Sequence, residues 1–152
     1  MNNDTIFALS SAHGKSGVAV VRISGQNLTD LAKRIIFSSH GGTRRSRKGV
    51  VPRHAYFTNL TDDNKDLIDQ CIAIYFGAPH SFTGEDIIEI HSHGSPAVIN
   101  KIFEFLRNKG CRIAQRGEFS KRAFYNNKTQ VCKFLHHDTF QYALFVPMAS
   151  MW

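Results

Sequence analysis

The segment DIIEIHSHGSPAVINKIFEFLRNKG, residues 86–110, holds the clearest structural signals in the chain. Its first six residues, Asp86 to His91, form a short isoleucine-rich run that predicts a strand. Further on, Pro96 suits the first turn of a helix and Gly110 suits its end. The apolar residues between these two recur at helical spacing: Val98, Ile99, Ile102, Phe103 and Leu106. This segment therefore predicts a strand followed by an amphipathic helix.

The same alternation of strand and helix extends to both sides of this segment. β-Branched and apolar runs bounded by turn residues predict further strands at 18–23, 55–59, 68–76 and 111–114. Apolar residues at helical spacing predict a helix over 28–36, and Gly117 begins a helical turn that runs through Phe124. We therefore expect the α+β class, with a mixed β-sheet and helices packed on it.

Length and composition limit the kind of protein this can be. With 152 residues, of which 42% are hydrophobic, the chain fits one domain with an ordinary core. Three cysteines without CxxC spacing predict buried thiols, with neither a disulfide framework nor a zinc knuckle. The first residues lack the pattern of a secretory signal, and no run is long enough to span a bilayer. We expect a cytoplasmic protein without a membrane partner.

The net charge of +7 favours a polyanionic partner. Basic residues concentrate in a loop from Gly41 to Arg53 and in a second cluster from Arg107 to Arg122. A general RNA-binding module that uses these two segments is therefore one hypothesis. Against it, the chain lacks the aromatic stacking motifs that RNA-binding sheets carry.

Two short motifs suggest enzymes but do not satisfy the full pattern. Gly14-Lys15-Ser16 matches the end of a phosphate-binding P-loop, yet the glycine required five residues earlier is Leu9. We therefore expect no GTP binding by this segment. His80, Ser81 and Asp86 could be written as a hydrolytic triad, but nothing around them resembles a nucleophile elbow.

Three potential metal ligands follow one another at alternate positions. Glu89, His91 and His93 would lie on one face if the strand continued through them. A metal-dependent hydrolase built on these residues is a third hypothesis. Histidines near a turn are more often structural, and an effective site draws on partners that a single sequence does not show, so we favour the reading without metal.

Three blocks of sequence, taken in order, resemble one known family. The first runs from Asp4-Thr5-Ile6 to Arg22-Ile23-Ser24-Gly25. The second is Ser81-Phe82-Thr83-Gly84-Glu85-Asp86 with Glu89-Ile90-His91-Ser92-His93-Gly94, and the third is Arg116 to Phe124 with Asn127-Lys128. These blocks are similar to the N-terminal domain of the TrmE/MnmE family of tRNA modification GTPases. The likeness extends from about Asp4 to Lys128.

The resemblance implies a domain that binds the reduced folate 5-formyltetrahydrofolate and pairs with a second copy in a homodimer. It carries the family's folate contacts onto Arg22, Glu89 and Lys128. Their chemistry is compatible, because a carboxylate can accept paired hydrogen bonds from the aminopyrimidine edge of a pterin, and cations suit a formyl oxygen or glutamate carboxylates.

For the full-length family the resemblance implies a larger assembly. A GTPase that uses GTP, magnesium and potassium acts with a flavoprotein partner to modify the wobble uridine of certain tRNAs. Without that GTPase region, we expect the present chain not to be catalytic on its own.

The sequence departs from the family pattern after Lys128. Residues 129–152 are rich in apolar side chains without a sustained period, where the family usually continues with a helix rich in Asp, Leu, Ala and Glu. We therefore expect a folate-binding and dimerisation domain over residues 1–128, followed by a divergent apolar tail over 129–152 that is typical of a truncated or frame-shifted product.

Overall fold

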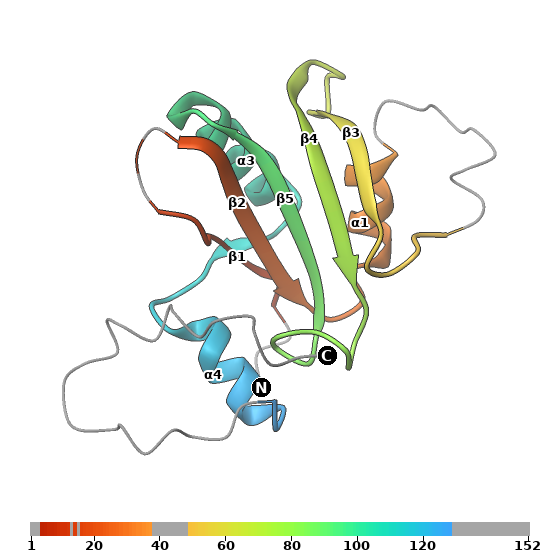
Figure 1. Ribbon diagram of the computed structural model, residues 1–152, viewed down its shortest axis with the longest axis vertical. Coiled ribbons are helices and arrows are strands. Elements are labelled where there is room, and N and C mark those ends of the chain that lie inside the picture. The colour runs from red at the N-terminus through yellow and green to blue at the C-terminus, as the bar shows by residue number, and fades with distance from the viewer. Residues whose placement is uncertain (1–3, 13, 15, 38–48, 129–152) are drawn as a thin grey trace.

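The computed structural model describes residues 4–12, 14, 16–37 and 49–128. Within them, six strands form one sheet: β1 (Ile6–Leu9), β2 (Ser16–Gly25), β3 (Ala55–Thr61), β4 (Leu67–Phe76), β5 (Asp86–Gly94) and β6 (Arg112–Ile113). Three helices accompany it: α1 (Thr29–Ile36), α3 (Pro96–Asn108) and α4 (Glu118–Tyr125). This is the α+β arrangement expected from the sequence (Figure 1).

The sheet is mixed. Its strand order is β3-β4-β5-β2-β1-β6, and every neighbouring pair is antiparallel except β1 and β6, which run parallel. The longest pairing joins β2 and β5 from Gly25↔Asp86 to Ser16↔Gly94. The strand predicted to end at His91 therefore continues to Gly94, while β1 is a strand that the sequence patterns did not predict.

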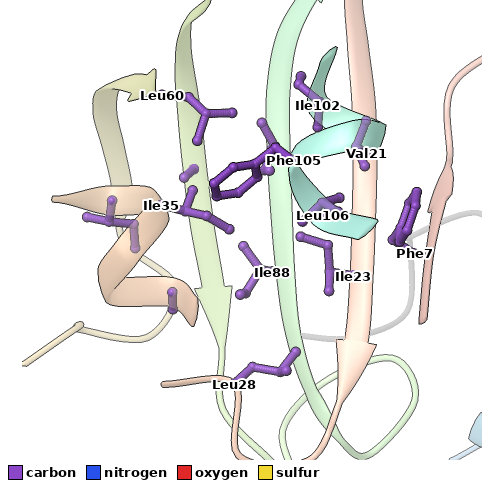
Figure 2. Close-up of a cluster of buried hydrophobic side chains, with 14 of the residues drawn as sticks. Phe7, Val21, Ile23, Leu28, Ile35, Leu60, Ile88, Ile102, Phe105 and Leu106 are labelled. Atoms are coloured by element: carbon purple, nitrogen blue, oxygen red, sulfur yellow. The ribbon is translucent and has the colours of Figure 1, made fainter. Parts of the chain in front are cut away.

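Helices α1 and α3 pack on the same face of the sheet, behind the strands in Figure 1. Alternate residues of the central strands point toward them, among them Val21, Ile23, Ile88 and Ile90, all fully buried. Figure 2 shows how Ile102, Phe105 and Leu106 of α3 meet this layer. Burial of these apolar side chains supplies the main stabilisation of the sheet and fixes which face each strand turns inward.

The opposite face of the sheet is covered by neither α1 nor α3. Across its middle, the pairing register places Phe57, Ile72, His91 and Val20 side by side on β3, β4, β5 and β2. Phe57 is 71% exposed and Ile72 is 42% exposed. We call this surface the helix-free face.

Several sequence predictions fall partly outside the described residues. Residues 41–48 of the basic loop, Cys132 and the whole 129–152 segment belong there. Cys71 and Cys111 are buried free thiols, as predicted, and burial raises the pKa of Cys71 to about 12 and that of Cys111 to about 11. In the part of the chain that the structure describes, no helix combines the length and the apolar character needed to cross a membrane.

Candidate functional site

Two of the three predicted site residues form an ion pair on the helix-free face. Arg22 of β2 and Glu89 of β5 are directly opposite each other in the antiparallel register. Arg22 Nε donates to Glu89 Oε1 at 2.9 Å, and Nη2 lies 2.7 Å from the same oxygen. The Glu89 residue is only 6% exposed. A nearly buried carboxylate held from one side is a strong hydrogen-bond acceptor, because little water competes for it.

His91 lies beside this pair, two residues further along β5. Its Nε2 atom is 3.4 Å from Glu89 Oε2. Nε2 is buried, and within the described residues it has no hydrogen-bond partner. Arg22 and His91 therefore flank the Glu89 carboxylate on different oxygens, and only the contact with Arg22 has hydrogen-bond geometry.

His93 has a different partner from that of His91. Its Nδ1 is 2.8 Å from Asp69 Oδ1 on β4, and its backbone N–H donates to Asp69 Oδ2 at 2.8 Å. The described part of the chain contains no group of three or more His, Cys, Asp or Glu side chains placed to hold a metal ion. Glu89 and His91 lie beside each other, whereas His93 pairs with Asp69, so the three predicted ligands do not meet at one point.

The loop of residues 81–85, which joins the preceding turn to β5, borders the ion pair; we call it the 81–85 loop. Phe82 places its ring beside Arg22, whose guanidinium carbon lies 5.5 Å from the ring centroid. Thr83 Oγ1 and Ser24 Oγ are 2.7 Å apart, and Ser24 donates to Glu85 Oε2 at 2.8 Å. The loop therefore covers Ser24, which is fully buried, and supports Arg22 from the side.

Lys128, the third predicted residue, packs against the same loop after the end of α4. Its backbone N–H donates to the Ala123 carbonyl at 2.8 Å, and the neighbouring Asn126 side chain donates to the Thr83 carbonyl at 2.7 Å. Gly84 has a φ of +78°, and a Cβ added there would lie 3.2 Å from Lys128 Cγ. The glycine thus leaves the space through which the lysine side chain passes.

The 81–85 loop connects all three predicted site residues. Phe82 contacts Arg22, which is paired with Glu89, and Gly84 contacts Lys128. Sequence reasoning did not single out Phe82 as a neighbour of Arg22. In the sequence, only its place in the second family block could have pointed to Phe82, because an aromatic residue in a loop can have many roles.

A dense ionic network fixes α4 to the rest of the domain. Arg122 reaches Asp4 Oδ1 at 2.7 Å, Glu85 Oε2 at 3.1 Å and Glu118 Oε1 at 3.3 Å. Arg112 pairs with Asp4 and with Glu118. The Arg122 side chain is 11% exposed, so these contacts are screened far less than surface ion pairs. The network joins the chain start, the 81–85 loop and α4.

The network predicts a specific response to acid. The hydrogen bonds from Arg112 lower the pKa of Glu118 from 4.5 to about 2. Because the folded-state pKa is the lower one, this carboxylate stabilises the fold fully above pH 4.5, and the contribution disappears as the pH falls toward 2. We expect Glu118→Gln to lower the free energy of unfolding by roughly 2–3 kcal/mol at neutral pH and by much less at a pH of about 2.

Urea unfolding of both proteins across this pH range measures the difference. Asp30, whose side chain is 94% exposed and pairs with Lys33, supplies the control variant Asp30→Asn. If the loss of unfolding free energy in Glu118→Gln stayed constant from neutral to acid pH, the assignment of the low pKa to Glu118 would be contradicted.

Ion pairs within the domain reduce the positive charge available for RNA. Within the predicted cluster from Arg107 to Arg122, Lys109 pairs with Asp63, and Arg112 and Arg122 pair with acidic residues. The three cations therefore serve contacts inside the domain. The other three cations of the cluster, Arg107, Arg116 and Lys121, are exposed.

The two other enzyme-like motifs can be compared with the structure only in part. Ser81 donates its hydroxyl to the Glu85 carbonyl, and Asp86 accepts the backbone N–H groups of Leu28 and Ala78 at 2.9 Å each. These bonds give both residues structural roles. In the Gly14-Lys15-Ser16 motif, Lys15 lies outside the described residues, and Ser16 begins β2.

The fold and this arrangement define an α+β domain in which a charged pair on the sheet lies beside a loop fixed by the last helix. The profile of the family described as "GTP-binding protein TrmE N-terminus" matches residues 5–128. The chain belongs to this family.

Curated proteins with similar sequences agree with the family match. The chain is 43% identical over 132 residues to the tRNA modification GTPase MnmE of Nitrosomonas eutropha, which covers 87% of this chain and 27% of that protein. It is 46% identical over 125 residues to the protein of that name from Sulfurovum sp., and 38% identical over 125 residues to that from Aquifex aeolicus; each alignment covers 82% of this chain and 26% of the relative. The chain spans about a quarter of the length of these relatives.

Proposed function

We propose that this domain binds 5-formyltetrahydrofolate at the Arg22–Glu89 pair and the adjoining 81–85 loop, with Lys128 as a further contact. The observation that carries the proposal is the nearly buried Glu89 carboxylate on the helix-free face, held by Arg22. A pterin ring presents an amino group and a ring N–H side by side, and a carboxylate is the complementary acceptor for both.

The cationic side chains of the site also suit the other parts of a reduced folate. Arg22 and Lys128 are cations next to the same loop, and they can donate to a formyl oxygen or to the glutamate carboxylates. Because Gly84 has no side chain, Asn126 and Lys128 can pack directly against the loop. The bound folate would supply a one-carbon unit at the formyl level, while the residues of this chain bind and orient it.

Titration of the chain with 5-formyltetrahydrofolate tests the proposal. We expect saturable binding and a rise in Tm, about 5 °C at a hundredfold excess over Kd, because a ligand selective for the folded state stabilises it. p-Aminobenzoylglutamate, which lacks the pterin, is expected to produce a much smaller rise. An unchanged Tm at millimolar folate, or equal responses to the two compounds, would refute recognition of the pterin at Glu89.

In its full-length context, the domain is proposed to serve the modification of wobble uridines in tRNA in the cytoplasm, together with a GTPase region and a flavoprotein partner. The relatives support this proposal through their name, tRNA modification GTPase MnmE. The present chain is proposed to contribute ligand binding and dimerisation, not GTP hydrolysis, since Leu9 occupies the position where a P-loop needs glycine.

The proposed homodimer would use the helix-free face. Phe57 and Ile72 are cross-strand neighbours there, and both are exposed to solvent in the single chain. A two-fold interface places the same patch on both subunits, so an apolar patch can bury itself against its own copy.

A substitution on this face is expected to separate the two subunits. Phe57→Asp should weaken self-association by at least about tenfold, because a charge in a closed interface lacks a partner. Leu67→Asp is the matched control, since Leu67 is 53% exposed but lines a cavity beside α3 on the other side of the sheet. Sedimentation at several concentrations distinguishes the variants. An equal effect of both substitutions would place the interface elsewhere.

A further inference from the structure

We infer that Arg122 is a positioning residue for the folate site, because it fixes the location of Lys128 through the 81–85 loop. The inference rests on the proposed folate function, and it adds a residue outside the three predicted contacts. Arg122 itself lies in the ionic network with Asp4, Glu85 and Glu118.

Arg122 makes an ion-pair contact between α4 and the 81–85 loop. Arg122 Nη1 lies 3.1 Å and 3.3 Å from the two carboxylate oxygens of Glu85. Glu85 in turn accepts the hydroxyl hydrogen of Ser24, two residues after Arg22 on β2. Arg122 therefore links α4, through a single carboxylate, to the strand that carries Arg22.

Residues that follow Arg122 also contact the 81–85 loop. Asn126 donates its backbone N–H to the Arg122 carbonyl at 3.0 Å and its side-chain amide to the Thr83 carbonyl at 2.7 Å. Lys128 is bonded to the Ala123 carbonyl, and its side chain runs along Gly84. The position of Lys128 thus depends on the contact between the end of α4 and the 81–85 loop. Arg122 maintains this contact.

A shorter or neutral side chain could not replace Arg122. Its guanidinium donates to the Asp4 carbonyl as well as to three carboxylates, in directions that a planar group with several N–H donors can satisfy together. Without Arg122, Asp4 and Glu118 keep their ion pairs with Arg112, but among the described residues Glu85 has no other ion pair, so its link to α4 is lost. Loss of Arg122 is therefore expected to release the loop from α4.

A double-mutant cycle on folate binding tests the inference. Lys128→Ala should weaken binding of 5-formyltetrahydrofolate about tenfold, through loss of a charged contact. Arg122→Gln should weaken it by a similar factor, and the double variant should be no weaker than either single one, because both changes remove the same contact. If the losses of affinity in the two single variants multiplied in the double variant, Arg122 would not act through Lys128.

Arg112→Gln is the matched control. Arg112 binds Asp4 and Glu118 of the same network, so its loss reduces stability while the contact between Arg122 and Glu85 is retained. We expect folate affinity to change by less than about twofold. If Arg112→Gln and Arg122→Gln lost folate affinity equally, Arg122 would only stabilise the fold, and the inference would be overturned.

Amide hydrogen exchange without ligand provides an independent measurement. In Arg122→Gln, exchange should accelerate at Lys128 and Asn126, whereas Ile88 and Ile90 in the central strand should keep their protection. Unchanged exchange at Lys128 would overturn the inference. If Arg122→Gln does not fold, Glu85→Gln can replace it, because it removes the charge facing Arg122 while keeping an acceptor for Ser24. Faster exchange at Lys128 in this variant would support the inference, and unchanged exchange would overturn it.

The two measurements separate this inference from the proposed function. If the parent protein does not bind 5-formyltetrahydrofolate, the proposed function fails, and the role of Arg122 in that site fails with it, even if hydrogen exchange shows Lys128 released. If the parent binds folate and Lys128→Ala weakens binding, but Arg122→Gln does not, the proposed function stands and only the inference on Arg122 fails.

Discussion

Replacing Glu89 with glutamine is expected to weaken the binding of 5-formyltetrahydrofolate by about 100-fold. The carboxylate can accept hydrogen bonds from two adjacent donors of a pterin edge, whereas an amide would turn its own NH₂ group toward one of them. Because the pterin's two donors face one donor and one acceptor, the variant both loses a bond and gains a repulsive contact. Calorimetric titration measures the change in Kd directly.

Glutamine is more informative here than alanine. Glu89→Ala should also remove most of the folate-dependent rise in Tm, but it leaves Arg22 without its partner on the helix-free face. Glu104→Gln is the control, because Glu104 is an exposed residue of α3 on the opposite side of the sheet. If Glu89→Gln and Glu104→Gln bound folate equally well, the assignment of Glu89 would be wrong.

Replacing Phe7 with alanine is expected to cost about 3–5 kcal/mol of unfolding free energy. Phe7 is fully buried on β1, and its ring packs edge-on against Phe103 of α3 at a centroid distance of 5.0 Å. Such a loss approaches the whole stability of a typical domain, about 5–15 kcal/mol. The variant should therefore be partly unfolded at growth temperature.

Urea unfolding followed by circular dichroism measures this loss. Phe124→Ala is the matched control, because Phe124 is 48% exposed and its truncation should change stability by less than about 0.5 kcal/mol. A loss below about 1 kcal/mol for Phe7→Ala would mean that β1 does not belong to the core.

The elements that could be predicted from sequence are those with long, regular patterns. The predicted strand at 18–23 lies within β2, and the predicted helix that begins at Pro96 is α3. In both, the apolar positions recur often enough to define a buried face. β1 escaped prediction because its four residues are too few to show a period, and its place between β2 and β6 depends on residues more than a hundred positions away.

The candidate site was predictable only to the extent that the family resemblance supplied it. Without that resemblance, Arg22 and Glu89 are ordinary charged residues of two strands, and nothing in the sequence gives the register that pairs them. The role of Arg122 was hidden for the same reason, since Asp4 is 118 positions away in the chain. Contacts of this kind depend on tertiary packing, which local patterns do not encode.

The parallel pairing of β1 with β6 and the contact between Asp4 and Arg122 also have a consequence for protein synthesis. Residues near the start of the chain find their partners only after about 120 residues have left the ribosome. Before β6 emerges, β1 has one open edge, and Asp4 has neither Arg112 nor Arg122 to bind. The domain is therefore completed only when α4 has emerged, and the Lys128 end of the site forms with it.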